Sequence, residues 1–447
     1  MLGLDTTQRE AIGLNYILRL LSPVSPYGTE KLRQIAPFTC SDAANRCFDN
    51  IEKLMVQDTE PLRDILAHFK NIRGILTKLA GTALNEVELF ETKGFLLTLE
   101  SFLPVFNEIN AYLQLSDIVF TPMTPALDIL DPKKTRIAPF SLDDGFSDIL
   151  PAARRKISWE EQTAEEMRIM SELSIQLRPH IPKFSRNMDS IGHLDLAIAK
   201  ATLAAAHYCV RPKISEATVV LHEMTNPMVA DALAETGCVM TPVSMTLGAN
   251  KPVIITGANM GGKSVAIKTA ALNAALCTLG IPVFASKAEI PLFDSIFLVS
   301  QDLQNTDAGL SSFGGEVIRL NDLAVSLNST QSNLFIALDE PARATNPAEG
   351  AAIVRALAAW LAQSGQICLL STHYDGITAP NAKYYRVAGL TNLPKSLGQA
   401  NIADYMDYRL VETNAADPIP KDALKICKLL GLDDELMAKI EEEYANG

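Results

Sequence analysis

A glycine-rich turn between an apolar run and a helical pattern constrains the fold of this chain more than any other stretch. Residues 253–255 are typical of a buried strand, and the helical pattern after the turn continues through Leu276. From Gly257 to Ser264 the turn matches G-x-x-x-x-G-K-[ST], in the order strand, loop, helix that this phosphate-binding motif requires. The alternative, a chance glycine-rich turn with a surface lysine, does not account for both flanks. The stretch therefore predicts a site for a nucleoside triphosphate.

Each residue type in this loop has a physical reason to be there. Glycines allow the backbone to turn so tightly that successive N–H groups point at phosphate oxygens, and the N-terminus of the following helix adds partial positive charge. Lys263 is expected to reach the β- and γ-phosphates as a catalytic cation, and the Ser264 hydroxyl is expected to bind Mg²⁺. The predicted nucleotide-binding residues of the loop are Gly257, Ala258, Asn259, Met260, Gly261, Gly262, Lys263 and Ser264.

The composition narrows the class of protein. With 447 residues, 48% of them hydrophobic and 20% charged, the chain is long enough for two or three globular domains. Its formal net charge of −13 argues against broad, sequence-independent capture of nucleic acid, although a local basic patch stays open. Seven cysteines without C-x-x-C spacing predict reduced thiols in a cytoplasm, and no apolar run reaches the length of a membrane span. A cytoplasmic location without membrane contact is expected.

The hydrophobic pattern changes along the chain. Residues 1–210 show mostly helical periods, interrupted by prolines between 118 and 150, and predict an all-helical domain without catalytic residues. From residue 213 onward predicted strands alternate with helices, which indicates a mainly parallel sheet covered on both faces. The fold class is thus α plus α/β, with a helical domain at 1–210, a phosphate-loop domain at 211–400 and a helical tail at 401–447. The predicted strands are 219–222, 253–256, 296–300, 334–338, 367–371 and 384–388, and the predicted helices of this half are 264–279, 315–328, 347–363 and 420–445.

Two later strands end in residues that suit phosphate chemistry. Asp339 and Glu340 follow a fully apolar strand, which is the pattern of a Walker B segment. We expect Asp339 to hold Mg²⁺ opposite Ser264, and Glu340 to orient or deprotonate the attacking water. His373 follows the next strand and is expected to contact the γ-phosphate or that water. The alternatives without a catalytic role are a helix cap for the two carboxylates and, for the histidine, a surface residue whose hydrogen bonds are satisfied.

Taken together, four segments resemble the ATPase domain of the MutS family in their order and spacing. The G-x-N-M-G-G-K-S form of the loop is much more specific than a bare phosphate loop, and no N-K-x-D guanine signal is present, so ATP is the nucleotide that the resemblance implies. The similarity covers about 211–445 well, and residues 12–210 resemble the helical core and lever of that family more loosely. The four segments are 257–264, 310–316, 339–350 and 371–377.

The resemblance implies an ABC-type ATPase head that works as a homodimer. Ser311 and Ser312 would then reach across the interface toward the γ-phosphate bound by the partner, and Asp302 would belong to an acidic loop just before them. The C-terminal helices would brace the dimer. This chain departs from the family in having Ala342 and Ala344 where many relatives have glycines.

Other departures concern the base and the partner. Cys238 stands near the place where relatives often carry an aromatic residue for adenine stacking, so the base platform is not assigned. The short segment 178–194 leaves no room for the DNA-encircling clamp that DNA-repair members carry at this point. A mismatch-reading domain is also not expected.

Two classes of partner follow from the resemblance. The favoured hypothesis is an ATP-driven machine that remodels a protein client, in the manner of a chaperone. It includes the reactivases of adenosylcobalamin-dependent aminomutases, whose T-N-P-x-E-G wording occurs at 345–350. The alternative is a DNA-binding MutS-type protein of repair or recombination, to which the negative charge is unfavourable.

Overall fold

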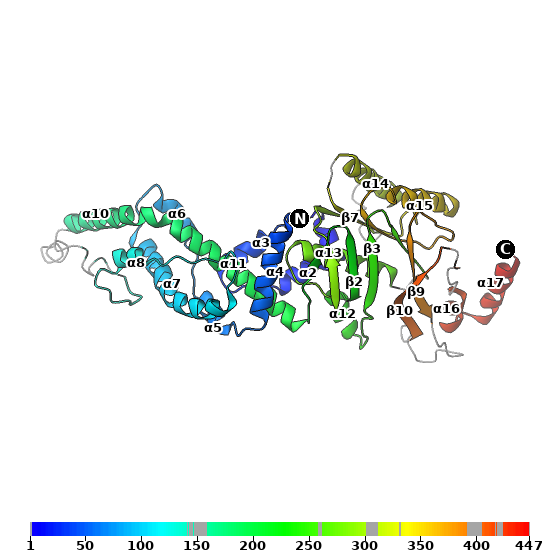
Figure 1. Cartoon of the computed structure of the whole chain (residues 1–447), viewed down its shortest axis with the longest axis horizontal. Helices are drawn as coiled ribbons and strands as arrows, with labels where there is room; N and C mark the ends of the chain where they lie inside the picture. Colours follow the sequence, from blue (N-terminus) through cyan, green and yellow to red (C-terminus); the bar gives the residue numbers. More distant parts are fainter. Residues whose placement is uncertain are drawn as a thin grey trace. The chain divides into compact units, whose positions relative to one another are not determined.

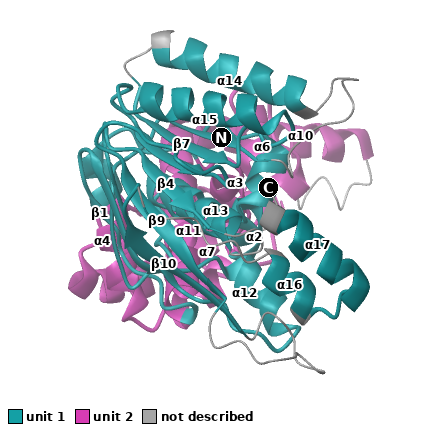
Figure 2. Ribbon diagram, turned by 90° about the vertical axis from the view of Figure 1, so that its right-hand side faces the viewer, with its two compact units in different colours: residues 1–20, 36–45, 206–447 teal, residues 21–35, 46–205 magenta. Residues whose placement is uncertain are grey.

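The computed structural model describes residues 2–140, 142, 146, 159–257, 262–300, 312–329, 332–390, 405–415, 417 and 423–446. The chain forms two compact units (Figure 2). Unit 1 consists of Met1–Leu20, Ala36–Asn45 and Ala206–Gly447, and unit 2 of Leu21–Ile35 and Arg46–Ala205. Each unit is thus built from segments that are not consecutive in the sequence. The three-part division at residues 210 and 400 stays a prediction.

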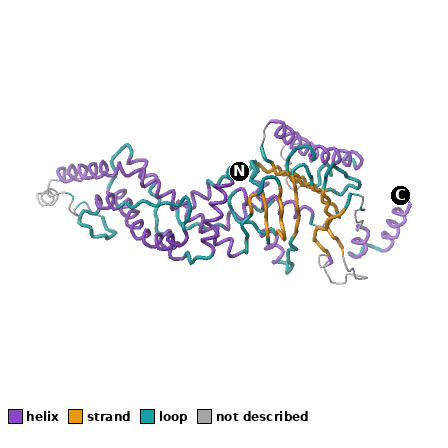
Figure 3. Tube along the Cα trace, in the orientation of Figure 1, coloured by secondary structure: helices purple, strands orange, loops and turns teal. Residues whose placement is uncertain are grey.

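Helices form the regular structure of unit 2 within the described residues (Figure 3). The long helix α7 begins with a capping box, in which Asn85 and Glu88 each accept a hydrogen bond from the other's backbone N–H. Its apolar face contributes to a cluster of aromatic rings, in which Phe69 lies 5.3 Å from Phe95 and 5.9 Å from Phe102 between ring centroids. The helices are α3 (Pro26–Arg33), α4 (Ser41–Met55, of which the residues up to Asn45 belong to unit 1), α5 (Glu60–Leu66), α6 (Arg73–Leu79), α7 (Glu86–Leu113), α8 (Thr124–Leu130), α10 (Trp159–Leu177), the 3-10 turn η1 (Arg178–His180) and α11 (Ile181–Ala206).

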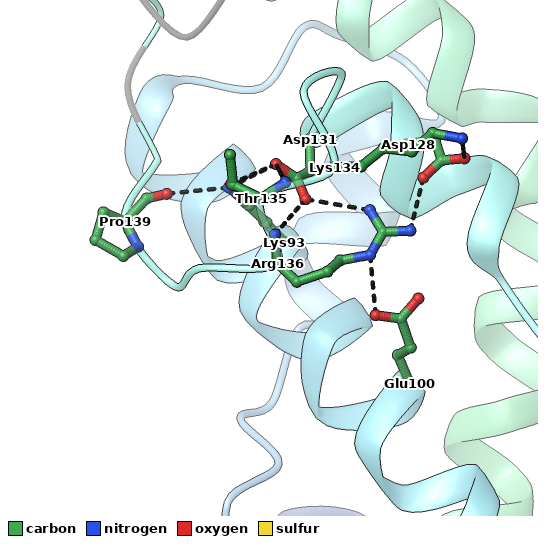
Figure 4. A network of polar contacts seen from close by, with 8 residues as sticks. All are labelled: Lys93, Glu100, Asp128, Asp131, Lys134, Thr135, Arg136 and Pro139. Carbon is green, nitrogen blue, oxygen red and sulfur yellow. Dashed lines mark hydrogen bonds and ion pairs between the residues drawn. The ribbon is translucent and has the colours of Figure 1, made fainter.

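A charged network joins α7 to the segment that follows α8 (Figure 4). Lys93 of α7 and Asp131 are both buried, with Nζ 3.8 Å from Oδ1. The Arg136 guanidinium pairs with Asp131 at 3.1 Å, with Asp128 at 2.7 Å and with Glu100 of α7 at 3.0 Å. Because buried charges are costly unless they are paired, removing one member of this network should destabilise unit 2.

We therefore expect Asp131→Asn to lower the free energy of unfolding at pH 7 by about 2–3 kcal/mol. Burial by itself raises the pKa of Asp131, but hydrogen bonds from Arg136 and Thr135 outweigh it and lower the pKa from 3.8 to about 2. Since the folded pKa lies below the unfolded one, the carboxylate stabilises the fold above about pH 4, and this contribution is lost as the pH falls through about 2. Urea unfolding at several pH values should show the variant and the wild type converging in acid. Glu108→Gln, which neutralises an exposed carboxylate of α7, is the control; parallel curves for Asp131→Asn and the wild type would contradict the assignment.

Within its described residues, unit 1 contains two sheets. The six-stranded sheet has the order β10-β9-β4-β8-β7-β6, and its neighbours pair in parallel except for β10, which is antiparallel to β9. The four-stranded sheet has the order β1-β5-β2-β3. The expected mixed α/β class with a mainly parallel sheet is confirmed. The strands are β1 (Lys213–Ile214), β2 (Thr218–Met224), β3 (Val243–Gly248), β4 (Val253–Thr256), β5 (Lys287–Ile290), β6 (Ser295–Val299), β7 (Leu334–Asp339), β8 (Ile367–Ser371), β9 (Lys383–Leu390) and β10 (Met406–Thr413).

Helices cover both faces of the six-stranded sheet (Figure 1). On one face, α14 (Ser312–Ser329) and α15 (Pro347–Leu361) pack through Leu323 and Val354 against alternate residues of the strands, among them Ile336. On the other face, α13 (Lys263–Thr278) packs against β7 and β8, and nearly all of its side chains are buried. The remaining helices of unit 1 are α1 (Thr6–Ala11), α2 (Leu14–Leu20), α12 (Pro227–Ala234), α16 (Ala423–Leu429) and α17 (Asp434–Asn446).

Two segments lie at the edges of the six-stranded sheet, and the sequence pattern predicted neither placement. At one edge of the sheet, the carbonyl of Leu2 accepts a hydrogen bond from the backbone N–H of Ile296 (2.9 Å), and the Gln8 side chain donates to the carbonyl of Leu298 (3.0 Å). At the other edge, residues 406–413 form β10 rather than part of a helical tail, so the expected helical tail is reduced to α16 and α17. Among the described helices, none combines the length and the apolar composition that a membrane span requires.

Candidate active site

The candidate site lies where three parallel strands end. In the pairing of β4, β8 and β7, Ser371 is the register partner of both Ile255 and Asp339. The last residues of these strands are therefore side by side, and each strand leads directly into one of the predicted motifs. The carboxyl edge of a parallel sheet is where α/β folds bind their ligands.

Lys263 is the first residue of α13 and points back into this edge. Its Nζ donates to the carbonyl of Gly257 at 2.8 Å and lies 3.1 Å from a carboxylate oxygen of Glu340. Both side chains are buried, the lysine to 4% and the glutamate to 9% exposure. The lysine and the carboxylate that were predicted to act together are thus in direct contact.

The two glycines that flank the loop have backbone angles that disfavour a side chain. Gly257 has φ +135° and Gly262 has φ +83°. A Cβ at Gly257 would also lie 3.3 Å from Cβ of Val387 on β9. These two positions therefore require glycine for a local physical reason, as the motif implies.

Asp339 is fixed by hydroxyl groups at the strand ends. Its Oδ1 accepts a hydrogen bond from the Ser371 hydroxyl at 2.7 Å, and its Oδ2 accepts one from Ser300 at 3.3 Å. The same Ser371 oxygen accepts the backbone N–H of Glu340 at 2.9 Å. One serine therefore orients both members of the acidic pair. Ser264 lies half-buried in the first turn of α13.

Glu340 has a second cationic partner. Arg343 donates to its other carboxylate oxygen at 2.8 Å, so that Glu340 lies between the guanidinium and the ammonium of Lys263. The backbone of Glu340 is left-handed, with φ +49°. A non-glycine residue in this region is strained, and such strain is typical of functional sites.

His373 lies beside this pair with one nitrogen unused. Its ring packs against Tyr374 with centroids 4.2 Å apart, and its buried Nδ1 makes no hydrogen bond to any described residue. Burial lowers the pKa of His373, the Glu340 carboxylate opposes this, and the charges of Arg343 and Lys263 add to it. The imidazole is therefore neutral at neutral pH, and its Nδ1 is available for a hydrogen bond to a phosphate oxygen or to water.

Several predicted residues cannot be compared with the structure. Ala258, Asn259, Met260, Gly261, Asp302 and Ser311 lie outside the described residues. Ser312 begins α14, but its side chain is also outside the description. Of the predicted set, the contacts given above bring together Gly257, Lys263, Asp339 and Glu340, and His373 is close enough for the charges of Glu340 and Lys263 to affect its pKa. The roles of these residues stay predictions.

Sequence reasoning assigned no role to three further residues at this edge. Glu316 accepts a hydrogen bond from the backbone N–H of Ala342, two residues after Glu340, and Tyr374 donates one to the carbonyl of Ala342. Tyr408 of β10 lies beside the loop, because a Cβ at Gly262 would be 3.2 Å from its ring atom Cδ1. Glu316 and Tyr374 stand inside quoted motifs, whereas Tyr408 was missed because its segment was predicted to be helical.

The residues present fit a magnesium-bound triphosphate. A buried ammonium and a helix N-terminus provide positive charge, Asp339 and the Ser264 hydroxyl are oxygen ligands of the kind Mg²⁺ prefers, and the buried Nδ1 of His373 has unused hydrogen-bonding capacity. When bound, Mg²⁺ would offset the negative charge of the phosphate groups. Ser264 and Asp339 are the residues that would hold it.

Comparison with known proteins agrees with this geometry. Residues 253–443 match the family model of MutS domain V. Curated relatives named Endonuclease MutS2 include those of Leuconostoc mesenteroides subsp. mesenteroides (28% identical over 281 residues, 62% of this chain and 33% of the relative), Ruminiclostridium cellulolyticum (28% over 293 residues, 64% and 34%) and Streptococcus gordonii (27% over 288 residues, 63% and 34%). The matched region spans about a third of the length of each of these relatives. Over residues 253–443 this chain is therefore similar to domain V of the MutS family.

Proposed function

We propose that this protein binds ATP with Mg²⁺ at the carboxyl edge of the six-stranded sheet and hydrolyses it. The observation that carries this proposal is the contact of Lys263 with Glu340 at 3.1 Å, between the phosphate loop and the Walker B strand of a MutS domain V. The unused Nδ1 of His373 beside that pair is further support.

The contacts suggest how these residues act. Phosphate oxygens compete with the Glu340 carboxylate for the ammonium of Lys263, so that binding of the triphosphate releases the carboxylate from one of its two cations. Glu340 is then available to accept a proton from the attacking water or to orient it. The neutral His373 donates or accepts one further hydrogen bond at Nδ1. Cys238 stands near the position where relatives often carry an aromatic residue that stacks on adenine. In this protein Tyr408, beside Gly262, takes that role.

The active form is a homodimer of two ATPase heads. Support comes from the resemblance of residues 311–313 to the family segment that reaches the partner's γ-phosphate. Closure of the heads on ATP and reopening after hydrolysis would drive the helical unit 2 between two arrangements. The same cycle of closure and reopening would apply whether the helical unit binds a protein or DNA.

Of the two partner classes, DNA has the more specific support. The curated relatives reported above are named endonucleases. The protein-client hypothesis rests on the sequence alone: the wording at 345–350, the short segment at 178–194 and the negative charge. We therefore propose a DNA structure as the client. The net charge of −13 limits binding to a local surface and predicts weak affinity for plain duplex DNA.

The test uses the full-length wild-type protein. Phosphate release from ATP should require Mg²⁺, and gel shifts with branched and duplex DNA should show ATP-dependent binding that weakens between 50 and 200 mM salt. Absence of hydrolysis would refute the ATPase proposal. Hydrolysis without DNA binding at low salt would refute the DNA client alone and leave a protein client. A pulldown with a non-hydrolysable ATP analogue would then identify that client.

A further inference from the structure

Three segments of the ATPase fold meet at the backbone of one residue, Ala342. The backbone N–H of Ala342 donates to Oε1 of Glu316 in α14 at 2.6 Å, and the carbonyl of Ala342 accepts from the hydroxyl of Tyr374, which follows β8, at 2.9 Å. Both the donor and the acceptor of a single residue are thus held by side chains from two other elements. Ala342 itself is completely buried.

Ala342 belongs to the loop that carries Glu340. Glu340 and Ala342 both have left-handed backbones, with φ +49° and +58°, on either side of Pro341. Residues with a Cβ disfavour this region, so two such residues in three positions persist only when the surroundings hold them there. The hydrogen bond that Glu316 accepts and the one that Tyr374 donates are suited to this task, since they fix the backbone of Ala342 two residues from Glu340.

The packing around Ala342 leaves little freedom for another arrangement. Gly350, at the start of α15, approaches so closely that a Cβ there would lie 2.8 Å from the carbonyl oxygen of Ala342. Tyr374 also packs against His373, with ring centroids 4.2 Å apart. The contacts at Ala342 therefore connect the loop of Glu340, through Tyr374, with His373.

A role in packing alone does not explain a buried glutamate at position 316. Its side chain is buried at 5% exposure, and burial raises the pKa of its carboxyl group. An apolar residue would fill the same space without the cost of burying a polar group. The hydrogen bond to Ala342 is the contact that explains a carboxyl group at this position.

We propose that Glu316 is a positioning residue for hydrolysis: by holding the backbone of Ala342 together with Tyr374, it sets the orientation of the Glu340 carboxylate. The inference rests on the proposed ATPase function and adds to it a residue outside the nucleotide contacts. The position of α14, which carries Glu316, then affects the rate of hydrolysis. The affinity for the nucleotide depends on the phosphate loop instead.

The test compares substitutions that remove the acceptor with one that keeps it. Glu316→Ala removes the acceptor, whereas Glu316→Gln retains an oxygen in the same place. Tyr374→Phe removes the second hydrogen bond with little change in volume. Asp322→Ala, which removes an exposed carboxylate from the same helix, is the matched control. Thermal unfolding of each variant shows whether it is folded.

The expected result is a fall in kcat without a matching change in affinity. Glu316→Ala should lower kcat about tenfold or more, with KM and the Kd of a fluorescent ATP analogue within about threefold of the wild type. Glu316→Gln should restore most of kcat, Tyr374→Phe should show a smaller loss, and Asp322→Ala should match the wild type. If Glu316→Ala does not fold, the Tyr374→Phe and Glu316→Gln measurements carry the test.

Specific outcomes would overturn the inference. A wild-type kcat in folded Glu316→Ala would do so, and so would a loss in Glu316→Gln as large as that in Glu316→Ala. A change in affinity in place of kcat would assign Glu316 to nucleotide binding and would equally refute the positioning role. Failure of the wild-type protein to hydrolyse ATP would instead refute the proposed function, so the two failures are distinguishable.

Discussion

Glu340→Gln is expected to bind ATP but to hydrolyse it about 10²–10⁴ times more slowly than the wild type. Glutamine has almost the same shape as glutamate, so the hydrogen bond between the backbone N–H of residue 340 and Ser371 is retained. It cannot accept a proton at neutral pH, however, and the ammonium of Lys263 loses an anionic partner. Phosphate release and binding of a fluorescent ATP analogue measure the two effects separately.

The same variant should accumulate the ATP-bound state. Size-exclusion chromatography with ATP is therefore expected to show more dimer for Glu340→Gln than for the wild type. Glu349→Gln, which neutralises an exposed carboxylate in the first turn of α15, is the control. A wild-type turnover rate in Glu340→Gln would show that this carboxylate has no part in the reaction.

Lys263→Ala is expected to abolish measurable hydrolysis and to weaken ATP binding by at least about 30-fold. Loss of one member of a buried, hydrogen-bonded charge pair costs about 2–5 kcal/mol, and the triphosphate would lose its only buried ammonium partner among the contacts described for this edge. Isothermal titration with ATP and Mg²⁺ gives the affinity. Lys251→Ala, an exposed lysine just before β4, is the control.

The Lys263 variants also test whether the ion pair of Lys263 with Glu340 stabilises the folded protein. Because Lys263 offsets the charge of buried Glu340, Lys263→Ala should lower the melting temperature, and Lys263→Met, which retains more of the packing, should lower it less. The double variant Lys263→Met with Glu340→Gln should recover part of the loss. ATP binding of normal affinity by folded Lys263→Ala would rule out the proposed role of the loop.

The strands that carry the motifs could be predicted from the sequence almost to the residue. The predicted strands 253–256 and 367–371 coincide with β4 and β8, because buried parallel strands are short apolar runs bounded by turn residues. β1, β3, β5 and β10 were not predicted. Exposure alternates in β3 and β5, β1 has two residues, and β10 has no buried residue and carries the charged residues Asp407, Arg409 and Glu412.

Long-range assembly was beyond the reach of sequence patterns. The periodicity of residues 1–20 predicts helices but contains nothing that assigns them to unit 1, with residues 206–447. For the same reason, local motifs led to Lys263, Asp339 and Glu340, whereas the contact of Glu316 with Ala342 joins residues in separate segments. The left-handed backbone of Ala342 also has no sequence signal, since alanine disfavours it.

The N-terminal segment has a consequence for the solubility of the molecule. β6 is the last strand of its sheet, and Leu2 and Gln8 occupy backbone groups of Ile296 and Leu298 that would otherwise face outward. An uncovered strand of this kind offers a template on which another chain can add, which is a common beginning of aggregation. Proteolytic trimming of the first residues would therefore expose the edge of β6 and favour aggregation in storage.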